Sequence, residues 1–455
     1  MGALIQLRTS PGSSRERSHR TPRDSTSQRS RLPAVLAVGL PMVVGLVHVG
    51  VVSPWYFVGS FDDDASYIMA AHALAGGHGM TATLPSGMVV ASLYPPGYSA
   101  LLAPLAWLWP HSFAPMRLLS VGCFALLFPL LWWYLERRGV GFAVRTAVLC
   151  VLALNPVLAT YGTMVMAEAP FLVAFLVLLL LVDRWDGLSP AGASRRSRLI
   201  TGTAVVLVAG AGVWLKEAAI GAVLGLIVWQ LWRRRVWRAV AVAAGTVLLL
   251  VPVVVARIVA GVPIAGSRYS QELGGYYAGG LVGRVLHVAP HALWQTLTTA
   301  LPASVVPYHN PLPQGSPWSG LWSVLSLHVS VFAVVGAVSW WRHHRDSAVM
   351  VIGVYLAETL LFPFINERRV VLVLPVVIAW YVIGALAVWR WLRPRVTTSA
   401  AGAGNRLVAA LQRRPVALNR GAACLAAVAV IVPLMLQFPR DYLFAVGQSS
   451  SHPQG

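Results

Sequence analysis

Long apolar stretches dominate the hydropathy pattern of this 455-residue chain. A helix needs about 20 mostly apolar residues to cross the hydrocarbon core of a bilayer. The candidate spans are roughly 33–57, 113–135, 142–162, 165–183, 199–215, 218–232, 238–260, 318–341, 348–365, 370–391 and 421–438. The apolar stretch 97–110 is too short to span and is typical of a re-entrant or interfacial helix. The pattern predicts an all-α polytopic membrane protein with about 11 transmembrane helices.

Composition supports this prediction and excludes two other classes. The chain is 57% hydrophobic and only 11% charged, whereas a soluble domain is about a quarter charged. These values exclude a water-soluble enzyme. The net charge of +20 would suit a nucleic-acid partner only if it lay on a soluble basic domain, and the sequence contains none. We therefore expect no nucleic-acid partner.

The basic residues indicate the orientation of the chain. With the N-terminus on the cytoplasmic side, 27 of the 35 Lys and Arg residues fall on that side, as the positive-inside rule requires. We expect the cytoplasmic (inner or plasma) membrane, with long extracytoplasmic loops at about 58–112 and 261–317. The remaining segments are a disordered Arg/Ser-rich cytoplasmic tail at 1–32, a basic cytoplasmic loop at 392–420, and a last span with an external tail at 421–455.

An acidic cluster follows the first predicted span. Asp62, Asp63 and Asp64 are adjacent, and the sequence from Ala65 through Tyr67 has helical periodicity. A carboxylate at a helix start that faces a cavity can act as a general base or a metal ligand. The alternative is a solvated cluster that only caps the helix. Downstream, Tyr94-Pro-Pro-Gly-Tyr98 leads into the short apolar helix.

These motifs resemble the first external loop of GT-C membrane glycosyltransferases. The shared string is D-D-A-x-Y, then A-x-x-L-A-x-G-x-G, then Y-P-P-G-Y before an apolar run. The group includes polyprenyl-phosphate-sugar-dependent enzymes such as protein O-mannosyltransferases, aminoarabinose transferases of lipid A and the RgtA/B/C/D-like proteins. The resemblance implies a GT-C-like domain over 33–391. It also implies that Asp63 is the catalytic base, with Asp64 as its acidic companion and Tyr67 as the aromatic position.

Later segments match the family more loosely. Glu168 resembles the acid that opens a membrane helix outside the bilayer, and Lys216 stands where the family has a basic residue. Asn366-Glu-Arg-Arg369 resembles the R-Y-x-x-P-x-x-P segment, with Arg369 in place of the Tyr. The resemblance implies that Arg368, Arg369 and Lys216 bind the donor phosphate. Asp62, Tyr67, Glu168 and Tyr94 are expected to support the site.

The placement of these charges agrees with such chemistry. All of them lie at external helix ends in the predicted topology, and charges at such depth usually face a cavity or a partner. The acids would deprotonate an acceptor hydroxyl, and the cations would stabilise the departing lipid phosphate. The alternatives are snorkelling or mutually paired helix-end charges for Glu168 and Lys216, and interfacial anchoring for Arg368 and Arg369.

We expect an inverting glycosyltransferase that takes a sugar from a polyprenyl-phosphate-linked donor. Its acceptor would be a cell-envelope glycan, glycolipid or protein at the outer membrane face. The alternatives are a multi-pass lipid or glycan transporter or flippase, and a surface-polysaccharide ligase. No cofactor is assigned, although a divalent metal stays open. His287 and His291 share a helical face but are better explained as interfacial, so no metal ligand is predicted.

Overall fold

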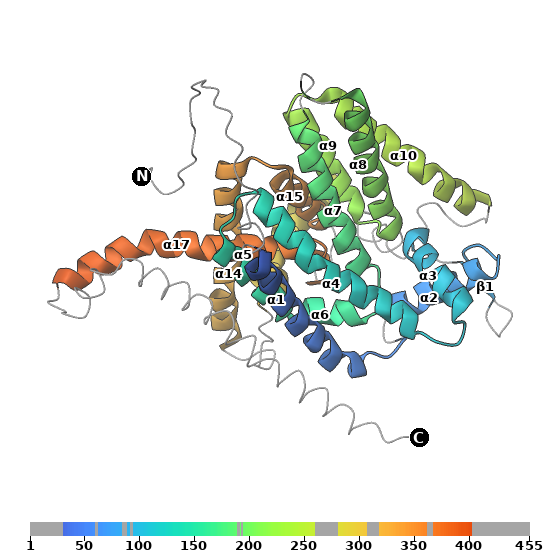
Figure 1. Cartoon of the computed structure of the whole chain (residues 1–455), viewed down its shortest axis with the longest axis horizontal. Coiled ribbons are helices and arrows are strands. Elements are labelled where there is room, and N and C mark those ends of the chain that lie inside the picture. The colour runs from blue at the N-terminus through green and yellow to red at the C-terminus, as the bar shows by residue number, and fades with distance from the viewer. Residues whose placement is uncertain are drawn as a thin grey trace, which may run out of the picture.

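The structure, a computed structural model, describes residues 31–59, 62–83, 89–91, 94–188, 192, 194–259, 281–306, 318–361 and 367–402. These residues are almost entirely helical (Figure 1). The elements are α1 (Arg31–Val52), η2 (Ser53–Trp55), α2 (Asp62–Ala75), β1 (Thr81–Thr83), β2 (Val89–Ala91), α3 (Pro96–Leu108), α4 (Ala114–Arg137), α5 (Phe142–Ala153), α6 (Pro156–Thr163), α7 (Glu168–Gly187), α8 (Arg195–Leu215), α9 (Ala219–Trp232), α10 (Val236–Val259), α12 (Leu281–Gln295), η3 (Thr296–Ala300), α13 (Leu301–Val305), α14 (Trp318–His344), α15 (Ser347–Thr359), α16 (Glu367–Val371) and α17 (Leu374–Gly402).

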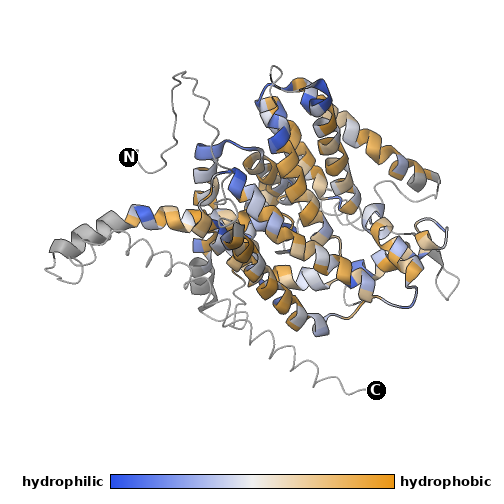
Figure 2. Cartoon of the chain, viewed as in Figure 1, coloured by the Kyte–Doolittle hydropathy of each residue, from blue (hydrophilic) through white to orange (hydrophobic). Residues whose placement is uncertain are grey.

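Five of the described helices are long and apolar enough to cross a membrane, or six if the bent pair α5–α6 forms one span. They are α1, α4, α8, α10 and α17. Their exposed faces carry large apolar side chains, as a lipid environment requires (Figure 2). The predicted all-α membrane fold is confirmed. The last predicted span, 421–438, and the tail after it lie outside the described residues.

The helices pack around two clusters of buried apolar residues, a large one in the bundle and a smaller one beneath α2 and α3. α7 packs on α4 and α8, α10 packs on α8 and α9, and α9 packs on α15. α14 and α17 cross very closely, because a Cβ atom at Gly336 would lie 1.8 Å from the carbonyl oxygen of Trp380. A Cβ at Gly384 would meet the carbonyl of Phe332 at the same distance. Glycines at both positions are therefore required for this crossing.

The described residues of the segment that is predicted to be the first external loop form a cap at one end of the bundle. α2 and α3 pack together, and the short antiparallel hairpin β1–β2 lies beside α2 (Figure 1). In this hairpin Thr81 pairs with Ala91. The short apolar helix predicted at 97–110 is found as α3, which starts at Pro96 as a proline in the first helical position allows. Its re-entrant or interfacial placement stays a prediction.

Several predicted helix ranges differ from the structure. The range 370–391 begins in α16 and continues in α17 after a break at 372–373. The range 142–162 is broken into α5 and α6, which meet at a bend of 59°. Asn155 caps α6 through its side chain and Pro156 opens it, so the chain restarts a helix here. At the other end, α17 continues to Gly402, beyond the predicted end at 391 and into the range assigned to a loop.

Candidate functional site

Asp64 is fully buried and bonded on both oxygens. Its Oδ2 accepts hydrogen bonds from the Tyr56 hydroxyl at 2.7 Å and from the Gly59 amide at 3.0 Å, while Oδ1 accepts from the Ala65 amide at 2.6 Å. The Tyr56 hydroxyl in turn accepts from the Val165 amide at 3.2 Å. Gly59 has a φ of +92°, which favours glycine at this turn. Asp64 thus joins the end of α1, the start of α2 and the chain before α7.

Asp63, one residue earlier, points to a different set of partners. The Tyr94 hydroxyl donates to its Oδ1, and Nη2 of Arg368 donates to its Oδ2. The side chain of Asp63 is 13% exposed, so part of it stays accessible from outside the protein. Arg368 lies in α16, more than 300 residues later in the sequence. Asp63, the predicted catalytic residue, and Arg368, the predicted phosphate-binding cation, therefore contact each other directly.

Glu168 is the second acid of this cluster and is fully buried. Its Oε1 accepts from Nζ of Lys216 and from Nε of Arg368, each at 2.5 Å. Its Oε2 has no hydrogen-bond partner among the described residues. Arg368 thus bridges two carboxylates, and Lys216 holds the second one. We call Asp63, Glu168, Lys216 and Arg368 the charged cluster. Its formal charges sum to zero.

The pKa values of the two basic members of the charged cluster are shifted in opposite directions. Burial by itself would lower the pKa of Arg368, but the charges of Glu168 and Asp63 outweigh burial and raise that pKa above its usual value. Burial lowers the pKa of Lys216 below its ordinary value, although Glu168 opposes the shift. Arg368 is therefore the permanently charged member, as guanidinium groups are in proteins.

Local packing explains how the first external loop reaches these charges. A Cβ atom at Gly97 would lie 2.6 Å from the carbonyl group of Trp214, so only glycine lets α3 approach the end of α8 this closely. Lys216 follows that end. The ring of Tyr67 lies 5.0 Å from the rings of Tyr94 and Tyr98, and burial raises the pKa of Tyr67 well above its usual value. The tyrosines form the uncharged wall beside Asp63.

Arg369 and Asp62, the two remaining predicted site residues, are not members of the charged cluster. The carbonyl of Arg369 accepts a hydrogen bond from Tyr355 at 2.7 Å, and its guanidinium lies in electrostatic range of Glu358 in α15. The backbone of Asp62 begins α2, and its side chain lies outside the described atoms.

Arg117 is a site residue to which the sequence analysis gave no role. Its Nη2 donates to the Ser53 carbonyl at 2.7 Å and also to the Ser53 hydroxyl, and its Nε donates to the Thr163 carbonyl at 3.3 Å. Its guanidinium stacks over the Tyr56 ring at 5.3 Å. The available signal was its place among the few external basic residues of the predicted topology.

No group of three or more His, Cys, Asp or Glu side chains that could hold a metal ion occurs among the described residues. His291 is exposed on α12, and the side chain of His287 lies outside the described atoms.

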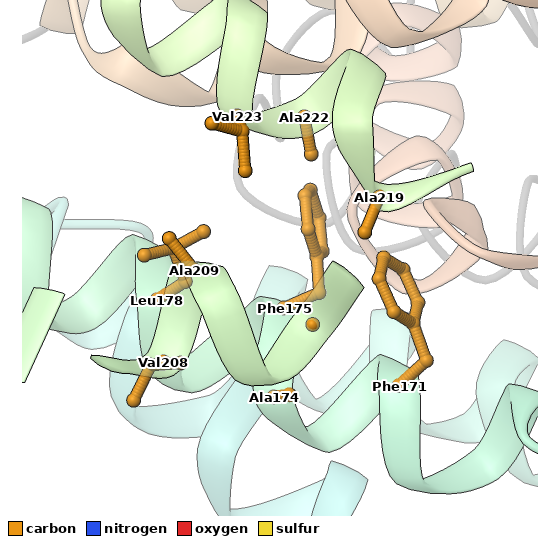
Figure 3. Close-up of a pocket in the computed structure, with 10 residues that line it drawn as sticks. Phe171, Ala174, Phe175, Leu178, Val208, Ala209, Ala219, Ala222 and Val223 are labelled. Carbon is orange, nitrogen blue, oxygen red and sulfur yellow. The ribbon is translucent and has the colours of Figure 1, made fainter. Parts of the chain in front are cut away.

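A small apolar cavity of about 10 Å³ lies between α7, α8 and α9, next to the charged cluster (Figure 3). Phe171 follows Glu168 by one helical turn, Gly212 precedes Lys216 by one turn, and Ala219 follows it closely. The cavity is lined by Phe171, Ala174, Phe175, Leu178, Val208, Ala209, Gly212, Ala219, Ala222 and Val223. A cavity of this volume has room for about one water molecule and not for a hydrocarbon chain.

No protein-family profile and no curated protein sequence matches this chain. Solved structures do match. The oligosaccharyltransferase AglB from Archaeoglobus fulgidus, solved with an inhibitory peptide and a dolichol-phosphate, superposes with a TM-score of 0.56 at 14% identity. The match covers 94% of this chain and 57% of AglB. A second AglB structure, tethered to an acceptor peptide with an NVT sequon, has a TM-score of 0.56 at 13% identity, covering 91% of this chain and 56% of that one.

ArnT from Cupriavidus metallidurans, bound to undecaprenyl phosphate, matches at a TM-score of 0.48 and 16% identity, over 93% of this chain and 74% of ArnT. The likeness to AglB shows that this protein shares the fold of AglB. The chain spans little more than half the length of AglB.

Proposed function

We propose that this protein is an inverting glycosyltransferase that moves a sugar from a polyprenyl-phosphate-linked donor to an acceptor hydroxyl. The observation that carries the proposal is the charged cluster, in which Arg368 joins Asp63 of the first external loop to Glu168. The GT-C fold supports the same class of reaction, since its solved neighbour AglB is an oligosaccharyltransferase bound to a dolichol-phosphate.

Arg368 is the proposed phosphate-binding residue. A guanidinium presents its donors in a planar fork that fits a phosphate as well as a carboxylate. In the structure one arm of this fork is held by Asp63. An incoming donor phosphate competes for that arm, and Glu168 keeps the other arm in place through Nε. Donor binding thereby releases the Asp63 carboxylate.

Asp63 is the proposed general base. The released carboxylate takes the proton of the acceptor hydroxyl, and the acceptor oxygen forms a bond to the anomeric carbon of the sugar. The bond between that carbon and the phosphate oxygen breaks, and the electron pair leaves on the polyprenyl phosphate. Arg368 stabilises that departing charge together with Lys216. A single displacement of this kind inverts the anomeric configuration.

The other predicted residues support these two. Asp64, whose oxygens already accept hydrogen bonds from Tyr56, Gly59 and Ala65, positions its neighbour by fixing the start of α2. Tyr94 and Tyr67 orient Asp63 and exclude water from one side of it. Arg369 and Asp62 stay predictions, as a further phosphate-binding cation and an additional acid.

The donor is proposed to be lipid-linked because AglB, which shares the fold, is solved with a dolichol-phosphate. A polyprenyl chain is a hydrocarbon, and the helices long enough to span a membrane expose large apolar side chains that such a chain can contact. The site is proposed to face outward from the cytoplasmic membrane. The acceptor stays within the predicted group of a cell-envelope glycan, a glycolipid or a protein.

Sugar transfer in isolated membranes tests the proposal. Membranes that contain the full chain would be supplied with radiolabelled polyprenyl-phosphate sugars, and label in the acceptor fraction would be counted. Asp63→Asn is expected to lose transfer by about 10²–10⁴-fold, the range for removal of a general base. Glu136→Gln is the matched control, because the Glu136 side chain is 53% exposed and pairs only with Arg145 in the described part of the chain. Full transfer by Asp63→Asn would overturn the assignment.

A further inference from the structure

A recess lined by two arginines lies at the opposite end of α7 and α8 from the charged cluster. α7 has 20 residues, which at 1.5 Å per residue separates its two ends by about 30 Å. This equals the thickness of a hydrocarbon core. The recess has a volume of about 290 Å³ and is lined by Leu181, Arg184, Ser194, Arg196, Ser197, Ile200, Thr201 and Ala204. Figure 2 shows hydrophilic segments at this end of the helices, away from α2 and α3.

The two arginines of the recess differ from their neighbours in having no acid partner. Nearby, Arg138 pairs with Asp183 at 2.6 Å and Arg235 pairs with Asp186. Arg184 and Arg196 line the recess, and no ion pair to either occurs in the described part of the chain. Their positive charges are therefore free to attract an anion.

A hydroxyl that lines the recess suits the same ligand. Thr201 lines the recess, and no hydrogen bond of its hydroxyl occurs among the described residues. The residue is only 4% exposed, but its hydroxyl oxygen is not among the fully buried atoms without a partner, so it can donate a hydrogen bond to a ligand in the recess. Ser194 caps α8 by accepting from the Ser197 amide at 3.1 Å. The recess thus offers two cations and a hydroxyl around one space.

The surface beside the recess is apolar and exposed. Leu199, Ile200 and Leu207 of α8 are all exposed large side chains, and α8 is one of the helices able to span a membrane. Acyl chains can contact this face while the headgroup enters the recess. A free phosphate ion has no apolar part that could contact this face.

We propose that the recess binds the phosphodiester headgroup of an anionic phospholipid. Basic pockets between membrane helices recognise such headgroups through charge and hydrogen bonds. Arg184 and Arg196 bind the phosphate oxygens, Thr201 donates a hydrogen bond to one of them, and the acyl chains lie along α8. This site is independent of the proposed sugar transfer.

Native mass spectrometry of the delipidated full chain in dodecyl maltoside tests the proposal. Phosphatidylglycerol would be titrated, with phosphatidylcholine as the neutral lipid. We expect phosphatidylglycerol to bind with clear preference. Each arginine near an anionic headgroup contributes enough to weaken binding several-fold when removed, so Arg184→Gln/Arg196→Gln should weaken it about thirty-fold. The control Arg195→Gln/Arg342→Gln removes the same charge from basic residues that do not line the recess, and should change binding less than about threefold.

Two further arms keep the test decisive. Thr201→Val retains the side-chain shape, so it should fold normally and still weaken phosphatidylglycerol binding several-fold. Inorganic phosphate at millimolar concentration should not displace the lipid; displacement would assign the recess to a free phosphate and overturn the proposal. Equal binding of the two lipids, or equal losses in the recess and control variants, would also overturn it.

Discussion

The charged cluster predicts a strong energetic coupling between Glu168 and Lys216. Glu168→Gln keeps the shape of the side chain but removes its charge, and it leaves Lys216 and Arg368 as neighbouring cations without the acid between them. Lys216→Met leaves Glu168 buried with Arg368 as its remaining partner. The double variant removes both charges and restores neutrality. The loss of unfolding free energy in the double variant should therefore be smaller than the sum of the losses in the two single variants.

The size of the coupling follows from the geometry. Unit charges about 4 Å apart interact by roughly 4 kcal/mol at an effective dielectric constant of 20. Glu168 is fully buried, while Lys216 is 17% exposed, so solvent screens part of this energy. We expect each single variant to cost about 3 kcal/mol, because breaking a buried pair leaves an uncompensated charge. The coupling energy should be about 2–3 kcal/mol.

The assay is reversible unfolding of the purified protein in mixed detergent micelles, with helicity followed by circular dichroism. The control cycle uses Glu136→Gln and Arg145→Gln, whose charged atoms lie 2.7 Å apart but whose acid is largely exposed. That surface cycle should give a coupling below about 1 kcal/mol. Additive losses at Glu168 and Lys216, within about 0.5 kcal/mol, would refute the charged cluster as a coupled unit.

Two further predictions concern how the site is positioned. Tyr56→Phe removes the hydroxyl that donates to Asp64 and accepts from Val165, so it should cost about 1–3 kcal/mol in the same unfolding assay; unchanged stability would contradict the structural role of Asp64. Gly97→Ala places a Cβ 2.6 Å from the carbonyl group of Trp214 and should cost about 1–3 kcal/mol. Gly122→Ala is its control: it meets nothing within 4 Å, so it should leave stability unchanged or raise it by up to about 1 kcal/mol.

The sequence predicts the membrane class of the fold better than its helix boundaries. Apolar length measures whether a segment can cross a bilayer, and it does not mark where a helix breaks or ends. Asn155-Pro156 breaks the range 142–162 through capping and a proline start, a local signal inside an apolar run. α17 continues past its apolar part, because the backbone hydrogen bonds of a helix form in water as well as in lipid.

The site could be predicted as a set of residues but not as contacts. The charge pattern predicts an external position for Asp63, Glu168, Lys216 and Arg368, whereas their shared hydrogen bonds depend on tertiary packing. The roles of adjacent Asp63 and Asp64 depend on the rotation of α2, which is fixed by Tyr56 and the turn at Gly59. Arg117 was missed because its partners are mostly backbone carbonyls, which no side-chain pattern reveals.

The central claim is that Arg368 exchanges the Asp63 carboxylate for the donor phosphate. Binding of undecaprenyl phosphate to the purified full chain tests it, because no sugar needs to be known. Arg368→Gln should weaken binding about tenfold or more, the loss of roughly 1.4 kcal/mol or more. Asp63→Asn should strengthen binding several-fold, since it removes the competitor for the same guanidinium. Weaker binding in the Asp63→Asn protein, or unchanged binding in the Arg368→Gln protein, would contradict the account.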